Sequence, residues 1–244
     1  MMAAREPEHW WYRARRELLF HVVRRHVARD APLLDLGCGT GWVLARIADW
    51  CEAWGLDPSP ENVARCHARG LHRVAAGTVE RLPTLPQAYF AAVCFLDVLE
   101  HLDDDREALE LARRALRPEG VVLVTVPAYR WLWSSHDRLH RHRRRYTAGE
   151  LRALLDRTGY DVVRLTYFNT LLLPFAILAR VAQRALGAPS LDMRVPPPLA
   201  NRALERLFLA ERHLLLRGTS RRYIPAGLSI LAVARARATV ARGG

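Results

Sequence analysis

Lysine is absent from this sequence: all 37 basic residues are arginine, and 25 aspartates and glutamates leave a formal net charge of +12. An excess of positive charge is one footprint of nucleic-acid binding. Abundant arginine and alanine are, however, typical of GC-rich coding. The charge alone is therefore weak evidence for RNA or DNA as the partner, and an acidic partner or an anionic membrane surface is an alternative.

Cysteine and long hydrophobic runs are scarce as well. The four cysteines, Cys38, Cys51, Cys66 and Cys94, show no C-x-x-C spacing, so we expect no cysteine zinc site, no metal cofactor and a reduced, cytoplasmic protein. No hydrophobic signal segment is present near the start, so export is not expected. The 244 residues, half of them hydrophobic, suffice for one large α/β domain with an appended segment.

The most informative stretch runs from Leu33 to Gly41 and reads LLDLGCGTG. A short apolar run contains an acidic residue, glycines then alternate, and an apolar helical pattern begins at Trp42, which predicts a buried strand, a tight turn and a helix. Glycine permits unusual dihedrals and the close approach of a ligand. Ligands of open α/β sheets bind at the carboxyl ends of the strands, so this turn is the predicted ligand site.

The spacing of the glycines discriminates between ligands. A dinucleotide site follows the pattern G-x-G-x-x-G/A, whereas this turn reads G-x-G-x-G and places Trp42 where the last small residue belongs. Asp35 precedes the first glycine and suits a cation better than a pyrophosphate. The ligand that fits is S-adenosylmethionine, because its ammonium and sulfonium groups need acceptors and its carboxylate needs backbone N–H groups.

The stretch from Leu33 to Gly41 resembles the first motif of class I S-adenosylmethionine-dependent methyltransferases. Three later stretches follow in the order that this family shows: GLDPS at 55–59, FLDVLEHL at 95–102 and LRPEGVVLVTVP at 116–127. The resemblance implies a doubly wound, Rossmann-like α/β fold, with a seven-stranded, mostly parallel sheet whose last strand is antiparallel and with helices on both faces. It points to the bacterial small-molecule branch of the family.

The resemblance also implies which residues bind the cofactor. Asp57 would accept the ribose hydroxyls, the alternative being helix capping before Glu61. Thr78 stands where relatives carry an aspartate that accepts a hydrogen bond from the adenine amino group, so Thr78 offers a hydroxyl there but no charge. Val79 would pack on the adenine edge. The residues after the fourth strand would lie under the methionine moiety. The expected cofactor-binding residues are Asp35, Gly37, Cys38, Gly39, Gly41, Asp57, Pro58, Thr78, Val79, Leu96 and Asp97.

The acceptor is expected beyond the fourth and fifth strands. His101 follows the fourth strand, and residues 129–146 interleave aromatic side chains with six arginines and the histidines His136 and His140. This basic segment is read as an acceptor-binding lid, the alternatives being a solvated loop or an RNA-binding surface. A base is needed only where the acceptor must lose a proton, and the candidates are the three histidines named here.

The chain outside the core adds two further segments. Residues 1–30 are expected to form an amphipathic helix that covers the pocket, or simply caps the core, and residues 31–168 the cofactor-binding core. Residues 169–222 form a helical insertion before the last strand, at 223–237, and residues 238–244 form a tail. The apolar run of the insertion is too short, and the insertion too charged, for a membrane span. The insertion is therefore expected to complete the core or to form a homodimer interface. The alternative is that residues around 170–220 lie on a membrane surface.

The leading hypothesis is methyl transfer to oxygen or nitrogen of a small-molecule acceptor, lipid- or glycan-linked, in the cytoplasm or at the inner face of the membrane. RNA methylation is the second hypothesis, resting on charge, although nucleic acid is the less expected partner. A non-catalytic, cofactor-binding protein docked on a membrane or a partner is the third. An oxidoreductase is the least expected, because the glycine spacing does not suit a dinucleotide.

Overall fold

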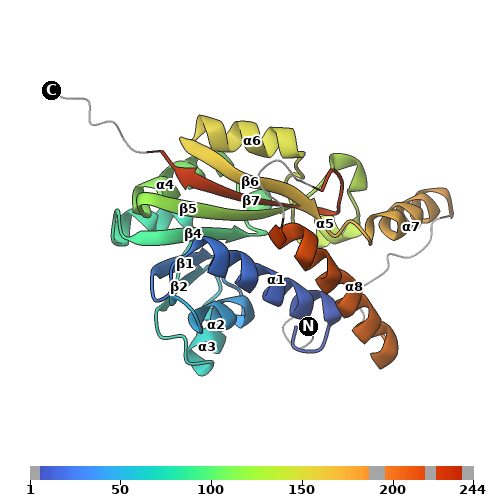
Figure 1. Ribbon diagram of the computed structural model, residues 1–244, viewed down its shortest axis with the longest axis horizontal. Coiled ribbons are helices and arrows are strands. Elements are labelled where there is room, and N and C mark those ends of the chain that lie inside the picture. The colour runs from blue at the N-terminus through green and yellow to red at the C-terminus, as the bar shows by residue number, and fades with distance from the viewer. Residues whose placement is uncertain (1–5, 187–195, 218–223, 238–244) are drawn as a thin grey trace.

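A seven-stranded sheet forms the centre of the computed structural model, which describes residues 6–186, 196–217 and 224–237 (Figure 1). The strand order is β3-β2-β1-β4-β5-β7-β6. The strands are β1 (Pro32–Leu36), β2 (Glu52–Asp57), β3 (Val74–Ala76), β4 (Phe90–Leu96), β5 (Leu116–Pro127), β6 (Tyr160–Phe168) and β7 (Ser229–Ala236).

Strand β7 alone runs against its neighbours. It pairs antiparallel with both β5 and β6, whereas the pairs β1–β2, β1–β4, β2–β3 and β4–β5 are parallel. The order reverses between β1 and β4, which opens a crevice at the carboxyl ends of these strands. The Rossmann-like class expected from the sequence is confirmed, antiparallel last strand included.

Helices cover both faces of the sheet (Figure 1). Helices α4 and α6 pack on one face, and α1, α2 and α3 lie on the other with α8 packed on α1. The helices are α1 (Trp10–His26), α2 (Trp42–Ala48), α3 (Pro60–Ala68), η1 (Val79–Thr84), η2 (Leu99–His101), α4 (Asp105–Ala115), η3 (Arg130–Leu132), α5 (Ser135–Leu139), α6 (Ala148–Arg157), α7 (Leu173–Leu186) and α8 (Pro198–Arg217).

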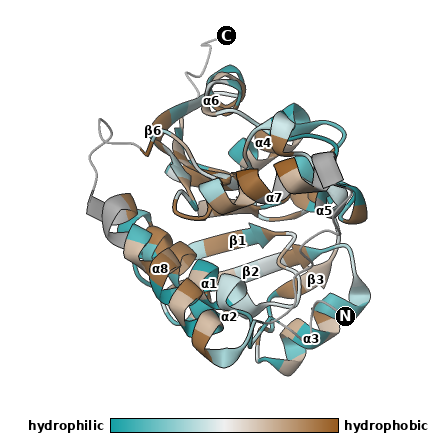
Figure 2. Cartoon of the chain, turned by 90° about the vertical axis from the view of Figure 1, so that its right-hand side faces the viewer, coloured by the Kyte–Doolittle hydropathy of each residue, from teal (hydrophilic) through white to brown (hydrophobic). Residues whose placement is uncertain are grey.

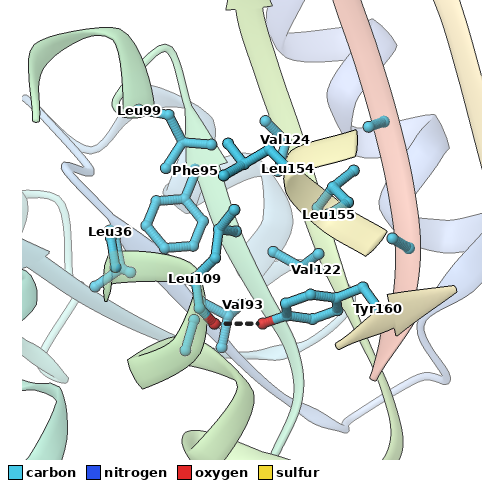
Figure 3. Packing of buried hydrophobic residues seen from close by; sticks show 14 of the residues in the cluster. Leu36, Val93, Phe95, Leu99, Leu109, Val122, Val124, Leu154, Leu155 and Tyr160 are labelled. Atoms are coloured by element: carbon cyan, nitrogen blue, oxygen red, sulfur yellow. Dashed lines mark hydrogen bonds between the residues drawn. The ribbon is translucent and has the colours of Figure 1, made fainter. Parts of the chain in front are cut away.

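The core under α4 and α6 is packed tightly around β4 and β5. Phe95 and Val122 are fully buried there, and the hydroxyl of buried Tyr160 donates to the carbonyl of Leu109 at 2.8 Å, so even its polar atom is satisfied (Figure 3). Strands β1 and β4 contribute buried side chains to the clusters on both faces of the sheet, so the strands that flank the crevice lie in the middle of the core.

Helix α8 of the insertion completes the opposite face of the core. Phe208 on α8 is 3% exposed and meets the rings of Trp10 and Trp11 edge-on. The side chain of Asn201 accepts from the Trp10 amide at 2.9 Å, and buried Glu211 accepts from the backbone amides of Asn169 and Leu171. The adjacent tryptophans of α1 thus pack against α8, as expected if the N-terminal helix caps the core.

Helix α7 has a different environment, projecting from the end of the molecule at which α1 begins (Figures 1 and 2). Its side chains Phe175, Leu178 and Val181 are 65%, 66% and 58% exposed. Their spacing of three residues places them along one face of the helix. Within the described part of the chain, no helix combines the length and the apolar character needed to cross a bilayer.

Some predicted element boundaries differ from those of the structure. Residues 6–9 precede α1 rather than forming its first turn, because the side chain of His9 caps the helix by accepting from the Trp11 amide. Strand β5 begins at Leu116 and includes the Arg-Pro-Glu-Gly stretch, although proline and glycine are typical of turns. Helix α6 begins with a capping box formed by Thr147 and Glu150.

Candidate active site

The glycine-rich turn between β1 and α2 adopts a backbone that side chains disfavour. Gly37, Gly39 and Gly41 have φ values of 68°, 58° and 82°. The amides of Gly37 and Cys38 both donate to the carbonyl of Leu56, at 2.7 and 3.1 Å, so the turn is fastened to the end of β2. A Cβ added at Gly39 would meet nothing within 4 Å. The turn therefore leaves open space for a ligand at Gly39.

That space belongs to a cleft of about 140 Å³. Its walls come from the β1–α2 turn, from the end of β4 and from the N-terminal part of α1. The lining residues are Glu6, Tyr12, Arg15, Arg16, Asp35, Gly37, Cys38, Gly39, Thr40, Trp42, Val43 and Leu96. Of the expected cofactor-binding residues, the structure thus brings Asp35, Gly37, Cys38, Gly39 and Leu96 together around one cavity.

Asp35 carries the strongest electrostatic feature of the cleft. It is 2% exposed, and its Oδ1 has no hydrogen-bond partner among the described residues. Burial raises the pKa of Asp35 to about 7; Arg15 lowers it in part and Asp57 raises it further. A buried carboxylate without a partner is costly unless a cation or a donor meets it. This wall of the cleft therefore fits a cationic ligand group such as an ammonium.

Asp57 lies behind the turn and is only 5% exposed. Its Oδ2 accepts from the Gly39 amide at 2.8 Å, and its Oδ1 accepts from the Ser59 amide at 2.9 Å and from the Asn62 side chain at 3.0 Å. The helix-capping alternative falls to Ser59, whose hydroxyl accepts from the Asn62 amide. Neither Asp57 nor Pro58 is among the residues that line the cleft. Asp57 thus shapes the glycine turn, and its bond to a ribose stays a prediction.

Asp97 ends β4 in a left-handed backbone conformation, with φ of 61°. Its carboxylate pairs with Arg15 at 2.8 Å and accepts from the Thr125 hydroxyl at 2.9 Å. Arg15 also donates to the Thr125 hydroxyl at 2.8 Å. The sequence analysis did not single out Arg15, Arg16 or Glu6. Arg15 therefore links α1 to the ends of β4 and β5, and α1 forms one wall of the cleft.

The remaining cofactor residues lie beyond the cleft. Thr78 precedes η1 at the end of β3, is exposed, and directs its hydroxyl to Glu80. Val79 is partly buried against the core. Gly41 is buried and begins α2 rather than lining the cavity. Contacts of Thr78 and Val79 with an adenine ring stay predictions.

Histidines cluster near the end of β4. The rings of His101 and His142 meet edge-on with centroids 4.7 Å apart, and the rings of His140 and His142 lie 6.1 Å apart. Burial lowers the pKa of both His101 and His140, and the nearby imidazole of His142 lowers the two pKa values further. Both rings are therefore neutral at neutral pH and able to accept a proton. His136 lies on α5, but its side chain is outside those that the structure describes.

The basic segment after β5 is fastened to the protein by its own arginines. Arg143 donates to the His101 carbonyl and pairs with Asp103, Arg144 donates to the carbonyls of Leu102 and Asp103, and Arg145 binds Asp137 at 2.7 Å. These bonds hold the segment against η2 and help to position the histidines. The use of the segment as an acceptor-binding lid stays a prediction.

A methyltransferase-domain family matches residues 10–165 of the chain. The chain is 33% identical over 159 residues, 64% of its length and 61% of the relative's, to a Mycolicibacterium smegmatis protein named "Probable S-adenosylmethionine-dependent methyltransferase". It is 34% identical over 107 residues, 42% of either chain, to a dTDP-3-amino-3,6-dideoxy-alpha-D-glucopyranose N,N-dimethyltransferase of Streptomyces fradiae. The chain thus spans about three fifths or less of the length of these relatives.

Two further comparisons agree with these. A ubiquinone biosynthesis O-methyltransferase of Alkalilimnicola ehrlichii is 35% identical over 99 residues, covering 38% of this chain and 40% of the relative. A solved S-adenosylmethionine-dependent methyltransferase of Archaeoglobus fulgidus has the same fold, with a TM-score of 0.55 at 19% identity over 90% of this chain and 94% of that one. The chain belongs to the family of S-adenosylmethionine-dependent methyltransferases.

Proposed function

We propose that this protein transfers a methyl group from S-adenosylmethionine to an oxygen or nitrogen of a small, lipid- or glycan-linked acceptor. The observation that supports S-adenosylmethionine as the cofactor is the buried carboxylate of Asp35, whose Oδ1 has no hydrogen-bond partner among the described residues, in a cleft beside Gly39, where a side chain would meet only open space. When bound, S-adenosylmethionine supplies a methyl group bonded to a positively charged sulfonium sulfur, and the neutral thioether that remains is a good leaving group. The residues of the chain have only to bind, orient and accept a proton.

The proposed roles follow from the contacts. Asp35 would bind the ammonium of the cofactor, and Gly39 would admit its methionine part. Arg15 holds Asp97 in place at the end of β4, where the acceptor would approach. Placing the reacting atoms in line supplies most of the catalysis. Where the acceptor is a hydroxyl or a protonated amine, neutral His101 or His140 would accept its proton.

Two relatives support the acceptor class. One is named for methylation of an amino sugar linked to dTDP, and the other for methylation in ubiquinone biosynthesis. The exposed apolar face of α7, formed by Phe175, Leu178 and Val181, supports an acceptor with a lipid part. We propose that this face rests on an anionic membrane, attracted by the net charge of +12. A homodimer formed through α7 is the competing use of the same face.

The cofactor half is tested by titration calorimetry of the protein with S-adenosylmethionine, S-adenosylhomocysteine and NAD. We expect micromolar binding of the first two and none of NAD, with affinity lost in Asp57→Ala because the turn at Gly39 loses its anchor. Binding of NAD alone would overturn the proposal. The acceptor half is tested with radiolabelled S-adenosylmethionine and bacterial lipid, glycan and RNA extracts. Label in lipid or glycan supports it, and label in RNA alone refutes it.

The membrane half is tested by flotation with vesicles of anionic phospholipid. Phe175→Glu with Leu178→Glu should release the protein from the vesicles while leaving cofactor binding unchanged. Leu139→Glu is the matched control, because Leu139 is 75% exposed but lies on α5. Equal flotation of all variants would refute the role of α7, and a monomer–dimer shift without loss of flotation would assign the face to a dimer.

A further inference from the structure

Three potential metal ligands converge shortly after the end of β4. Glu100 and His101 lie on η2, His142 follows α5, and one ligand atom of each lies within 4.8 Å of the others. We propose that Glu100, His101 and His142 hold a divalent transition-metal ion at the acceptor end of the crevice. The proposal stands independently of the acceptor class proposed above. The sequence analysis expected no metal because it considered only the cysteines.

Glu100 is the residue that most needs a partner. Its side chain is 0% exposed, and neither carboxylate oxygen has a hydrogen-bond partner among the described residues. A buried carboxylate that lacks hydrogen bonds is stabilised when a cation binds it. The carboxylate faces the two imidazoles rather than solvent.

His142 is oriented as metal-bound histidines are. Its Nδ1–H donates to Asp137 at 2.9 Å, which makes Nε2 the nitrogen that carries a lone pair. Asp137 is fully buried, and Arg145 and Ser134 also bind it. Burial opposes its ionisation, but the hydrogen bonds from His142 and Arg145 hold the pKa of Asp137 well below its usual range. A carboxylate that accepts a hydrogen bond from the second ring nitrogen is typical of histidines that bind a metal.

The backbone already brings these ligands together. The Arg143 amide, next to His142, donates to the Glu100 carbonyl at 2.8 Å, and the Arg143 side chain donates to the His101 carbonyl at 2.9 Å. Bonds of about 2.1 Å to a metal place tetrahedral ligand atoms roughly 3.4 Å apart. The three ligand atoms already lie within 4.8 Å of one another, so the movement needed to bind an ion is on the order of 1 Å.

The ligand set selects the kind of ion. Two imidazoles and one carboxylate suit Zn²⁺, Co²⁺ or Fe²⁺ and leave coordination positions open, whereas Mg²⁺ prefers oxygen ligands. Because η2 begins three residues after β4 ends, the ion would lie past the carboxyl end of β4, on the side where the acceptor is expected. An acceptor hydroxyl bound to it would lose its proton more readily. His101 would then be a ligand, and His140 would remain as the proton acceptor.

The test is titration of chelator-treated protein, without a histidine tag, with Co²⁺ followed by visible absorption. We expect one equivalent of Co²⁺ to bind, to be displaced by Zn²⁺, and to be unaffected by a large excess of Mg²⁺. Glu100→Gln keeps the shape of the side chain, and His142→Gln changes a residue of a surface segment. Each should weaken Co²⁺ binding by at least about tenfold.

Matched controls separate loss of the site from loss of the fold. Glu61→Gln and His72→Gln remove an exposed carboxylate and an exposed imidazole elsewhere, and should bind Co²⁺ as the wild type does. Circular dichroism and calorimetry with S-adenosylmethionine report whether Glu100→Gln still folds and still binds cofactor. Loss of Co²⁺ with cofactor binding retained supports the site. Absence of stoichiometric Co²⁺ binding in the wild type, or its survival in both ligand variants, overturns it.

Discussion

Alanine substitutions at three glycines with positive φ distinguish the role of the β1–α2 turn in folding from its role in binding the cofactor. Gly70, after α3, has φ of 83° and is exposed, and Gly39 and Gly41 have φ of 58° and 82°. A Cβ at Gly39 or Gly70 meets nothing within 4 Å, whereas at Gly41 it would lie 2.7 Å from Cys66 Sγ and 2.9 Å from Leu71 Cδ1. Alanine at each position therefore carries the same backbone cost but different packing costs.

The left-handed backbone should cost alanine about 1–2 kcal/mol of unfolding free energy at all three positions. At Gly41 the contacts with buried Cys66 and Leu71 add overpacking of about 1–3 kcal/mol, which gives a total of roughly 2–5 kcal/mol. Gly39→Ala should be no less stable than Gly70→Ala. Its new methyl group, however, projects into the space that the cofactor is proposed to fill. We expect Gly39→Ala to fold and to lose S-adenosylmethionine binding, and Gly70→Ala to retain it.

Urea unfolding gives the stabilities, and calorimetry with S-adenosylmethionine gives the affinities. If Gly39→Ala binds the cofactor as tightly as Gly70→Ala does, the β1–α2 turn does not contact the cofactor, and the proposed cofactor site is wrong. If Gly41→Ala loses no more stability than Gly70→Ala, the packing of Cys66 and Leu71 against the turn is looser than the structure shows. The two readouts are independent, so one argument can fail while the other holds.

Two further predictions concern the scaffold around the site. Tyr146 donates its hydroxyl to Asp105 at 2.7 Å, so Tyr146→Phe should lower the unfolding free energy by about 1–2 kcal/mol without changing cofactor affinity; an unchanged urea midpoint would show that water replaces the bond. Phe208 is 3% exposed and meets Trp11 edge-on, so Phe208→Ala should cost about 3–5 kcal/mol in the same assay. A loss below about 1 kcal/mol would mean that α8 is not part of the core.

Local patterns predicted the parts of the site that adjacent residues build. The alternation of glycines after an apolar run identified the turn, and the structure places Asp35 and Gly39 in one cleft there. The capping box of Thr147 and Glu150 was likewise readable, because both partners lie within one helical turn. In each case the interaction joins residues close in sequence, so spacing and residue type carry the information.

Contacts between distant segments were not predictable in the same way. Arg15 meets Asp97, and the Trp10 amide meets Asn201, across 191 residues in the second case. The arginines after β5 were interpreted as part of an acceptor-binding lid, and nothing local shows that Asp103 and the His101 carbonyl lie opposite them. Likewise, the convergence of Glu100, His101 and His142 depends on a fold that brings the segment after α5 back to β4.

Proton release on cofactor binding follows from the environment of Asp35. Its pKa in the folded protein is about 7, raised from 3.8 chiefly by burial. A raised acid pKa makes the folded state bind more protons than the unfolded state between these values, so its contribution to stability is lost as pH rises from about 4 to 7. Three pKa units correspond to about 4 kcal/mol. Asp35→Asn should therefore make the free energy of unfolding depend less on pH between about 4 and 7, and should also weaken cofactor binding.

A cation placed against Asp35 reverses the preference and favours its ionised form. Binding of S-adenosylmethionine at pH 6 should then release close to one proton, and its affinity should rise up to about tenfold per pH unit below 7 and level off above. Calorimetry at pH 6 in two buffers of different ionisation enthalpy measures this release directly. Asp35→Asn, if it still binds, should give the same heat in both buffers. The same heat from the wild type would mean that no positive group of the ligand meets Asp35, since its proton has no other reason to leave.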